Sequence, residues 1–328
     1  MVIIFRVIAN PLVGSGHVYR SLTLAHEMSE NKVLFITEDS DSKTVNKIIN
    51  GQFPIISEKK DNIVQRLLSE MPDIVINDIL DTHEHDVFPL KNAGIRVINF
   101  EDLGSGAKQA DITINELFET PIIESDNILW GSQYFFVREE FDNANPHESF
   151  KDVKSVLLSF GGIDKLNCTL KAYLSIKEFC KQHQIKISIV TGPGYLEYEK
   201  LEELTKNDEN TVLKNSPGII SKIMEKCEIA ITSNGRTVYE LAHMNIPSIA
   251  IPQHDREGTH EFASSDRGFV VLKKNSPQSE EITSDILLAF QKLVENHSHR
   301  NDLYSKMRQY KFDKNRKKVV NLILNKLS

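Results

Sequence analysis

Cysteine and tryptophan are scarce in this chain, which has three cysteines and one tryptophan among 328 residues. An odd number of cysteines without paired spacing excludes a cysteine-rich zinc site and favours a reduced, cytoplasmic protein without disulfides. No apolar run approaches the roughly 18 residues that a membrane helix needs. The opening apolar run 2–8 has the length of a strand and lacks the features of a signal peptide. We therefore expect no integral membrane segment.

Basic residues do not dominate, because 39 Lys and Arg stand against 46 Asp and Glu, a formal net charge of −7. This balance excludes a sequence-wide grip on nucleic acid or anionic lipid, and it leaves room for a local phosphate pocket. Hydrophobic residues make up 40% of the chain and charged residues 26%, so a packed core is expected rather than disorder. The length corresponds to about two domains of roughly 150 residues.

Short apolar runs alternate with amphipathic stretches along the sequence. The runs carry β-branched residues at consecutive positions, which is typical of strands buried on both faces. In the first half, strands are predicted over 2–8, 33–37, 53–57, 74–77, 96–100 and 111–115, and helices over 17–29, 42–50, 62–70 and 83–92. In the second half, strands are predicted over 155–160, 186–190, 211–214, 229–232 and 247–251, and helices over 168–182, 196–206, 219–226, 237–243 and a tail over 279–328. This alternation predicts an α/β fold with parallel sheets.

A polar stretch without periodicity, 142–149, separates the two halves and is predicted to be an interdomain linker. We expect two Rossmann-like domains facing a cleft, an N-terminal domain over 1–145 and a C-terminal domain over 150–328 that includes the helical tail. Ligands of open α/β sheets bind beyond the carboxyl ends of the strands. Functional residues are therefore sought in the loops that follow the predicted strands.

The loop after the first strand reads NPLVGSGH over 10–17 and leads into the first helix. Glycines let a backbone approach a ligand closely, and a helix N-terminus attracts anions, so Gly14 and Gly16 are predicted to contact substrate. A dinucleotide fingerprint needs a third glycine where Tyr19 stands. The loop therefore disfavours NAD or FAD as a ligand.

His17 is the residue of this loop best suited to chemistry. The helix dipole at its position favours the neutral imidazole that a general base requires, although a histidine that only fills a polar corner of the loop is the alternative. Arg20, one turn further on, is predicted either to meet an anionic group of the substrate or to pair with a surface acid.

Two glycine turns in the second half also follow predicted strands. The Gly161-Gly162 turn can cradle a phosphate, or it is simply a tight connection between strand and helix. The segment 231–242 reads ITSNGRTVYELA and predicts a second anion nest at the start of a helix. The turn residues of this nest are Ser233, Asn234 and Gly235. Glu240 is placed to accept hydrogen bonds from ribose hydroxyls, or it is an ordinary helix acid.

The loop 251–263 reads IPQHDREGTHEFA and packs two histidines, an arginine and three acids into eight residues. A merely solvated loop has no need of this density, so His254 and His260 are predicted to contact substrate. His260 does not open a zinc-protease motif, because Ser264 stands where the second histidine belongs. The segment THEHD over 82–86 reads as a helix cap followed by first-turn acids. We therefore expect neither a metal nor another cofactor.

These segments, taken in order, resemble the GT-B-type nucleotide-sugar enzymes, in particular the UDP-sugar hydrolase family of pseudaminic acid biosynthesis and its spore coat polysaccharide relatives. Further matching segments are FED over 100–102, DITIN over 111–115 and QYFFVREEF over 133–141, and the likeness runs from residue 1 to about 270. The resemblance implies a C-terminal half that binds a UDP-sugar. It places Gly161, Gly162, Ser233 and Gly235 against the diphosphate and Glu240 against the ribose.

The resemblance also implies a reaction. His17 would position or deprotonate a water that attacks the anomeric carbon and releases UDP without a metal, and backbone N–H groups would stabilise the developing negative charge. The implied product is a free 2,4-diacetamido-trideoxyhexose-type sugar for nonulosonic acid or surface polysaccharide biosynthesis.

One segment departs from the family. The hydrolases carry Asp-His-Tyr after the fourth strand, with the tyrosine reaching the sugar, whereas this chain reads NDILD over 77–81. Asp78 or Asp81 is predicted to replace the tyrosine as a sugar contact. The 253–263 loop is similar to a loop near the donor sugar in the peptidoglycan GlcNAc transferase, so a GT-B glycosyltransferase is the alternative function. A non-catalytic nucleotide-sugar binder is a third.

Overall fold

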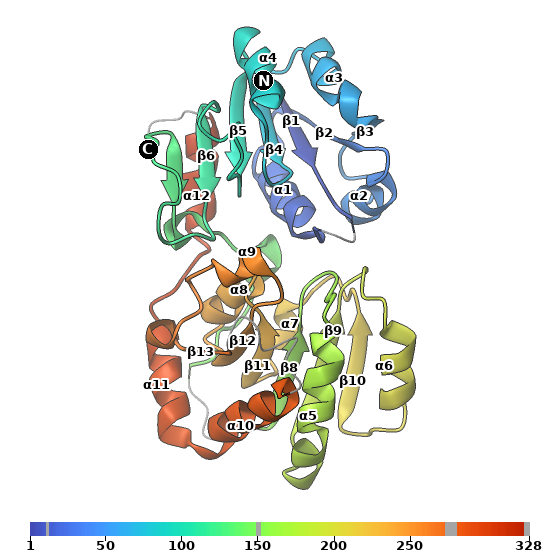
Figure 1. The fold of residues 1–328 in the computed structure, drawn as a ribbon, viewed down its shortest axis with the longest axis vertical. Coiled ribbons are helices and arrows are strands. Elements are labelled where there is room, and N and C mark those ends of the chain that lie inside the picture. Colours follow the sequence, from blue (N-terminus) through green and yellow to red (C-terminus); the bar gives the residue numbers. More distant parts are fainter. Residues whose placement is uncertain (11–12, 149–151, 273–280, 325–328) are drawn as a thin grey trace. The chain divides into compact units, whose positions relative to one another are not determined.

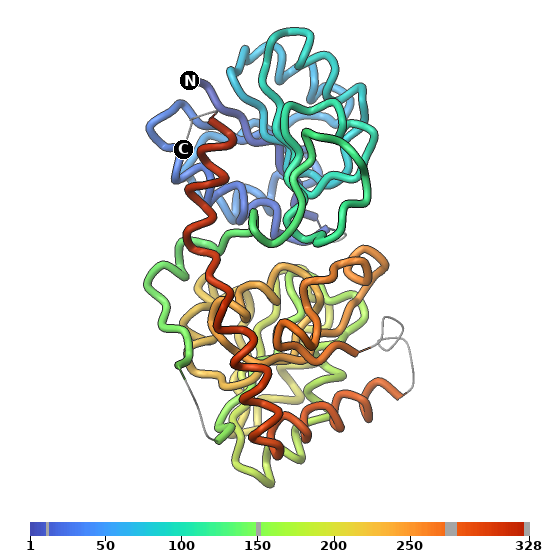
Figure 2. The backbone as a smooth tube through the Cα atoms, turned by 90° about the vertical axis from the view of Figure 1, so that its left-hand side faces the viewer, coloured from blue at the N-terminus to red at the C-terminus, as the bar shows by residue number. Residues whose placement is uncertain are grey.

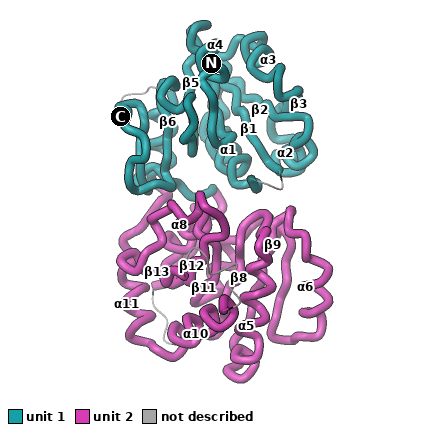
Figure 3. The backbone as a smooth tube through the Cα atoms, viewed as in Figure 1, with its two compact units in different colours: residues 1–138, 314–328 teal, residues 139–313 magenta. Residues whose placement is uncertain are grey.

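The structure is a computed structural model that describes residues 1–10, 13–148, 152–272 and 281–324. The chain divides into two compact units (Figure 3), and each has its own parallel sheet. Unit 1 comprises Met1–Arg138 together with Lys314–Ser328, and unit 2 comprises Glu139–Asp313. The predicted fold class, two Rossmann-like α/β domains, is confirmed for the two units taken separately.

Unit 1 contains a seven-stranded sheet with the strand order β3-β2-β1-β4-β5-β6-β7 (Figure 1). Its strands are β1 Val2–Val7, β2 Lys32–Glu38, β3 Ile55–Glu58, β4 Ile74–Asp78, β5 Arg96–Phe100, β6 Ile112–Asn115 and β7 Ile128–Trp130. Its helices are α1 Gly16–Glu27, α2 Ser42–Ile49, α3 Ile63–Ser69, α4 Glu84–Asn92, α12 Asn315–Leu324 and the 3-10 turns η1 Lys60–Asn62 and η2 Ser132–Tyr134.

Strand β1, an interior strand of the sheet, contributes side chains to both hydrophobic clusters of unit 1. Phe5 packs in one cluster, where its ring stacks on Phe35 at 5.2 Å between centroids. Ile4 points the other way and joins Ile36 and Val75 in the second cluster. Successive side chains of a strand face opposite sides of the sheet, so the apolar positions 2–5 of β1 reflect burial on both faces.

Unit 2 contains a six-stranded sheet with the strand order β10-β9-β8-β11-β12-β13. Its strands are β8 Ser155–Ser159, β9 Lys186–Thr191, β10 Thr211–Asn215, β11 Ile229–Ser233, β12 Ser248–Ile251 and β13 Phe269–Val271. Its helices are α5 Cys168–Gln182, α6 Tyr198–Thr205, α7 Ser221–Met224, α8 Thr237–His243, α9 Asp255–Gly258, α10 Ile282–Glu295, α11 His297–Met307 and the 3-10 turns η3 Glu139–Phe141 and η4 Ser265–Arg267. Leu158 and Ile231 of the sheet pack in one cluster with Ile176 of α5 and Phe290 of α10.

The last helix differs from the sequence prediction, which kept 150–328 together with its helical tail. In the structure α12, the red end of the chain in Figure 2, belongs to unit 1. Its Val319 and Ile323 are fully buried in the core around β1. Arg316 forms an ion pair with Glu27 of α1 at 2.7 Å. The guanidinium of Arg96 in β5 also donates to the carbonyl oxygens of residues 322 and 323 of α12. Apolar packing, an ion pair and hydrogen bonds therefore hold α12 to unit 1.

The polar stretch predicted as a linker also differs. The backbone N–H of His147 donates to the carbonyl oxygen of Met244 at 3.0 Å, and the Asn245 side chain donates to the His147 carbonyl at 2.9 Å. These bonds fasten the stretch to unit 2, and the boundary between the units falls at Arg138 instead. The strands β7 and β13, of three residues each, were not predicted because runs that short carry no periodicity.

The membrane expectation can be compared with the helices directly. Within the ranges that the structure describes, no helix combines the length and the apolar character that a membrane crossing demands.

Candidate functional site

His17 and Asp78 form a buried pair at the carboxyl end of the unit 1 sheet. His17 is the second residue of α1, and Asp78 is the last residue of β4, where it lies in register beside Val7 of β1. His17 Nδ1 lies 2.6 Å from Asp78 Oδ1. The exposed fractions of the two residues are 5% and 0%. The fold therefore brings together two groups of opposite acid–base character.

Besides His17, two residues of α1 hold the Asp78 carboxylate. Arg20 Nε donates to Oδ2 at 2.9 Å, Arg20 Nη2 donates to Oδ1, and the Ser21 hydroxyl donates to Oδ2 at 3.0 Å. Burial raises the pKa of Asp78, but the charge and hydrogen bonds of Arg20 and His17 outweigh it, so the pKa lies well below its ordinary value. Asp78 is consequently ionised. The prediction that Asp78 touches the sugar differs from this geometry, because its carboxylate is enclosed by protein.

Arg20 is enclosed as well, with 1% of its surface exposed. Besides Asp78 it pairs with Glu116, and its Nη1 lies 3.4 Å from an oxygen of Glu101. Its guanidinium also lies 5.0 Å from the ring centroid of Phe100. Burial lowers the pKa of Arg20, and the three carboxylates raise it well above its usual value. Of the two predicted roles, pairing with acids describes the structure, although the acids are buried rather than on the surface.

The proton positions of the pair follow from its hydrogen bonds. An ionised Asp78 oxygen can only accept, so the 2.6 Å contact assigns the proton to Nδ1 of His17. Arg20 Nη2 lies 3.2 Å from the same Nδ1. Because both nitrogens then carry hydrogens, this contact is not a hydrogen bond. In the neutral form of this imidazole the remaining ring nitrogen, Nε2, carries the lone pair. A histidine oriented by a buried carboxylate in this way can act as a general base.

The glycines predicted to contact substrate, Gly14 and Gly16, shape the turn between β1 and α1. Gly14 has a φ of +88°, which a residue with a side chain rarely adopts. Its N–H donates to the carbonyl oxygen of Asn10 at 2.9 Å, which closes the turn. Gly16 is the first residue of α1. The turn therefore places His17 in the first turn of α1. The Gly14 N–H is already bonded within the turn and is not available to a ligand.

Two loops at this end of the unit 1 sheet contain non-glycine residues with positive φ. Leu80, two residues after Asp78, has a φ of +67°, and Glu101, directly after β5, has a φ of +55°. Neither residue type favours this region, and such strain is concentrated at functional sites. Glu101 gains its contact with Arg20 in this conformation. Asp81, the other predicted sugar contact, is exposed and accepts a hydrogen bond from the N–H of Leu103 at 2.9 Å.

In unit 2 the Gly161-Gly162 turn is packed tightly against a neighbouring loop. A Cβ on Gly192 would lie 2.3 Å from the Cα of Gly162, and the N–H of Gly194 donates to the Gly162 carbonyl at 2.9 Å. Asp164, two residues after the turn, caps α5. Its two carboxylate oxygens accept the backbone N–H groups of Cys168 and Thr169, in the first turn of α5, each at 2.7 Å. A protein carboxylate thus occupies the donors that a phosphate would use at α5.

The second predicted nest interlocks with the 253–260 loop. The Asn234 side chain donates to the carbonyl oxygens of Glu257 and His260, each at 2.9 Å, and His260 Nδ1 lies 2.9 Å from the Asn234 carbonyl oxygen. Ser233 and Asn234 are both buried. The structure therefore brings these two sequence motifs together in one cluster.

Glu257 is the residue of this cluster that sequence reasoning did not single out. Its Oε2 accepts the N–H of Gln253 at 2.8 Å, and its Oε1 lies 3.1 Å from the place of a Cβ on Gly235. Burial outweighs the opposing effects of His254 and the nearby hydrogen-bond donors, so the pKa of Glu257 lies above its ordinary value. The sequence signal was its place in a loop dense with charge, but nothing in the sequence indicates that this acid turns inward.

His254 and Glu240, two residues of unit 2 predicted to contact substrate, lie at the start of a short helix and within a helix, respectively. His254 precedes α9, and its Nδ1 accepts the N–H of Glu257 at 3.3 Å, so it caps that short helix. Its side chain remains 62% exposed. Glu240 lies one turn into α8 and is buried. The assignment of Glu240 to a ribose stays a prediction.

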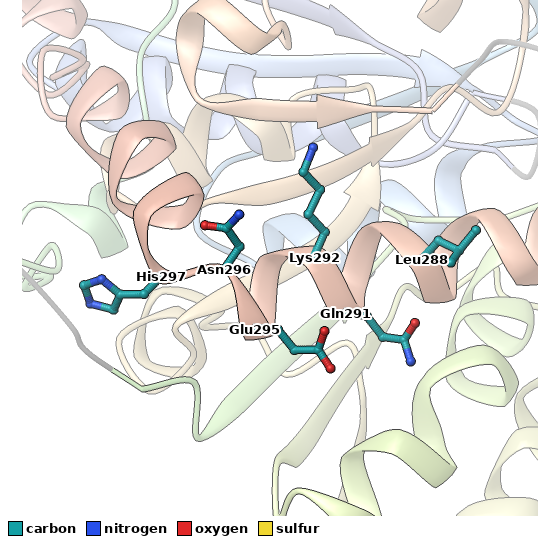
Figure 4. Close-up of a pocket in the computed structure, with 6 residues that line it drawn as sticks. All are labelled: Leu288, Gln291, Lys292, Glu295, Asn296 and His297. Carbon is teal, nitrogen blue, oxygen red and sulfur yellow. The ribbon is translucent and has the colours of Figure 1, made fainter.

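Other features of the surface lie away from these loops. A hollow on unit 2 is lined by Leu288, Gln291, Lys292, Glu295, Asn296 and His297 of α10, α11 and the turn between them (Figure 4). None of these residues was predicted to bind substrate. In the described part of the chain, His, Cys, Asp and Glu side chains form no group of three or more arranged to hold a metal ion.

Comparison with known sequences finds distant relatives, and no protein family model matches. The chain is 28% identical over 264 residues to an uncharacterized protein of Methanocaldococcus jannaschii, covering 74% of this chain and 54% of that protein. It is 18% identical over 265 residues to the spore coat polysaccharide biosynthesis protein SpsG of Bacillus subtilis, covering 78% of each. The chain thus spans about half the length of the first relative and over three quarters of the second.

Solved structures match over nearly the whole chain. MurG of Acinetobacter baumannii has a TM-score of 0.67 at 16% identity, covering 99% of both chains. The Staphylococcus aureus MnaA–UDP co-structure has a TM-score of 0.66 at 11% identity, covering 100% of this chain and 98% of that one. The kitacinnamycin glycotransferase has a TM-score of 0.69 at 12% identity, covering 100% and 99%. The fold is therefore that of the GT-B glycosyltransferases.

Proposed function

We propose that this protein is a metal-independent hydrolase that cleaves a UDP-linked sugar into the free sugar and UDP. The observation that carries the proposal is the buried pair of His17 and Asp78, with Nδ1 and Oδ1 2.6 Å apart at the carboxyl end of a parallel sheet. The sugar, a 2,4-diacetamido-trideoxyhexose type, is proposed from the sequence resemblance, as is a place in nonulosonic acid or surface polysaccharide biosynthesis.

The proposed step uses water as the nucleophile. His17 Nε2 takes a proton from the water as its oxygen bonds to the anomeric carbon, and the bond from that carbon to the diphosphate oxygen breaks. The electron pair of the broken bond leaves with UDP. The imidazolium that forms is stabilised by the ionised Asp78, as in other histidine–carboxylate pairs. Return of the proton to solvent resets the site.

The nucleotide is assigned to unit 2, because its glycine turns lie at strand ends where open α/β sheets bind ligands. Support comes from the fold, since one structural neighbour is a co-structure with UDP and another, HepE of Anabaena, is a complex with UDP and glucose. The spore coat polysaccharide relative is consistent with a sugar substrate.

Water is favoured over a lipid-linked acceptor by the surface of α1. The large apolar side chains of this fully described helix are buried or half-buried, and none belongs to the exposed apolar residues of the described chain. A transferase that docks on lipid would be expected to expose an apolar or basic patch there.

The test is an incubation of the purified protein with a panel of UDP- and CMP-sugars in the absence of any acceptor. We expect release of UDP from one donor, and a loss of roughly 10²–10⁴-fold in rate for His17→Ala, which removes the general base. His26→Ala is the matched control, because His26 lies on the same helix and bonds the Gln52 side chain instead of a carboxylate.

The remaining outcomes separate the alternatives. Nucleotide release that requires an acceptor glycan would replace the hydrolase with a glycosyltransferase. Equal activity of wild type and His17→Ala, or binding without turnover in both, would remove the catalytic role of His17 and leave a nucleotide-sugar binder.

A further inference from the structure

Arg20 presents different parts of its guanidinium to different acids of unit 1. Its Nε and Nη2 donate to the two oxygens of Asp78, Nε at 2.9 Å. Its Nη1 forms an ion pair with Glu116 and lies 3.4 Å from an oxygen of Glu101. Because the guanidinium is planar and holds its donors in a fixed fork, a partner that binds Nη1 also limits the direction of the other two donors. Glu116 therefore helps to orient the edge that Arg20 turns toward Asp78.

This network lies in a part of unit 1 with almost no solvent. The exposed fractions of Arg20, Asp78 and Glu116 are 1%, 0% and 1%, and the ring of Phe100 covers the guanidinium. A buried carboxyl group without a cation beside it commonly takes up a proton instead of staying ionised. Burial indeed raises the pKa of Asp78, and Arg20 opposes this effect more strongly than His17 does. Arg20 is therefore the main group that allows Asp78 to remain charged.

The number of protons on the His17–Asp78 pair decides whether His17 can act as a base. When Asp78 is ionised, one proton on Nδ1 of His17 joins the pair, and Nε2 keeps its lone pair. When Asp78 takes up a proton from solvent, its hydroxyl donates to Nδ1, and the neutral imidazole carries its hydrogen on Nε2. The nitrogen that would accept a proton from water is then occupied. Loss of the charge of Arg20 favours this second state, because the buried pair is then uncharged.

We propose that Arg20 is a positioning residue for the hydrolysis, whose positive charge keeps Asp78 a pure acceptor and so reserves Nε2 of His17 for the proton of the attacking water. The inference rests on the proposed function, because it takes His17 as the general base. Arg20 acts through Asp78, since its own side chain is enclosed by protein.

Nitrogen-15 NMR of protein labelled at histidine tests the proposal without any substrate. The chemical shift of a ring nitrogen distinguishes one that carries a hydrogen from one that carries a lone pair, and the signals of His17 are those that His17→Ala lacks. At about pH 7 most of an ordinary histidine is neutral. Under these conditions Nε2 of His17 should carry a lone pair in wild type and a hydrogen in Arg20→Gln. Arg20→Lys keeps the positive charge and should keep the lone pair.

Arg6→Gln is the matched control for the loss of a buried arginine. Arg6 is buried in the same unit and forms an ion pair with Asp86 of α4 at 2.9 Å. Its replacement removes an equivalent charge and leaves the Asp78 carboxylate with its donors. The signals of His17 in Arg6→Gln should therefore match those of wild type.

Steady-state kinetics of the same variants links the proton position to the reaction. Arg20→Gln should lower kcat for UDP release by roughly 10²–10⁴-fold, as loss of a general base does. KM should change little, because Arg20 does not face substrate. Arg20→Lys should recover most of the lost kcat, and Arg6→Gln should retain the wild-type value.

The outcomes separate this inference from the function on which it rests. If Nε2 keeps its lone pair in Arg20→Gln, or if Arg20→Lys or Arg6→Gln changes the His17 signals as Arg20→Gln does, the role of Arg20 is wrong. Unchanged kcat in an Arg20→Gln protein whose Nε2 carries a hydrogen would overturn it as well. If wild type hydrolyses no donor, the proposed function fails, while the NMR comparison still decides whether Arg20 controls the proton of His17.

Cooperative thermal unfolding establishes that each variant is folded. Should Arg20→Gln not fold, the double variant Arg20→Gln/Glu116→Gln takes its place with the same expected results. It removes one buried charge of each sign from the ion pair of Arg20 and Glu116, so it avoids leaving the second carboxylate without its partner.

Discussion

His17 Nδ1 lies 2.6 Å from Oδ1 of Asp78, although 61 positions separate the two residues in the chain. The pair exists because β1 and β4 are neighbours in the sheet, so that the helix after β1 starts beside the last residue of β4. Asp78 thus acts as a positioning residue that sets which ring nitrogen of His17 carries the proton.

Asp78→Asn should impair the proposed hydrolysis with little change in size. An amide can present its NH2 group to Nδ1 and favour the wrong tautomer, so kcat for UDP release is expected to fall by roughly 10²–10⁴-fold. KM should change little, because the enclosed carboxylate does not face substrate. Steady-state kinetics with the best donor measures both values. A variant with unchanged kcat would show that the pair does not prepare the base.

The same substitution should also lower the stability of unit 1. Asp78 balances Arg20 in a site without solvent, and removing one partner of a buried ion pair typically costs about 3–5 kcal/mol. Urea unfolding of Asp78→Asn measures this loss. Asp302→Asn is the matched control, because its ion pair with Lys306 is exposed and should contribute less than about 1 kcal/mol.

His243 predicts a pH dependence of stability. Its burial, aided by the charge of Lys311, lowers the pKa of His243 to about 4. The unfolded histidine titrates near 6.5, so between these values the unfolded state binds more protons and stability falls as the pH falls. From pH 7 to pH 5 the loss should be about 2 kcal/mol.

Urea unfolding at the two pH values checks this loss, with His243→Gln as the variant that removes the titrating group. Exposed His297 offers a control, and His297→Gln should keep the wild-type pH dependence. Equal pH dependence in wild type and His243→Gln would contradict the prediction.

Two glycines of unit 2 should respond differently to alanine. Gly192→Ala puts a Cβ 2.3 Å from the Cα of Gly162, a backbone clash that should cost about 3 kcal/mol or more. Gly161→Ala meets nothing within 4 Å, and its φ of +79° leaves only conformational strain of about 1–2 kcal/mol. Urea unfolding of both variants measures the difference. Equal losses would mean that the two loops are not in close contact.

Ile323→Ala should destabilise unit 1 through its last helix. Ile323 is fully buried in the unit 1 core, and truncating such a side chain costs about 2–5 kcal/mol. Hydrogen exchange should show faster exchange in β1 and β4, whereas β8 and β11 keep their protection. Leu288→Ala, at a position 65% exposed, should change stability by less than about 0.5 kcal/mol. Selective loss of protection in unit 2 would contradict the placement of α12.

Local pattern was sufficient to predict much of the fold. The apolar and β-branched residues that open β4 and β11 indicate strands buried on both faces, and both strands are buried at every position. The alternation of such strands with amphipathic helices requires parallel sheets. Glycines before α1 and α8 marked turns at strand ends, because φ values and helix starts depend on neighbouring residues alone.

Long-range contacts decided the rest. The sequence named His17, Arg20 and Asp78 separately and assigned two of them to substrate, whereas packing joins all three in one enclosed network. The sequence did not single out Glu257, because an acid that turns inward has the same sequence pattern as one on the surface. It also grouped the last helix with the second unit, because an apolar stripe does not indicate which unit it packs against. The sequence by itself thus determined two α/β units and the loops that carry chemistry. Only tertiary structure decided which side chains meet, because burial and partners depend on strand order rather than on neighbours in the chain.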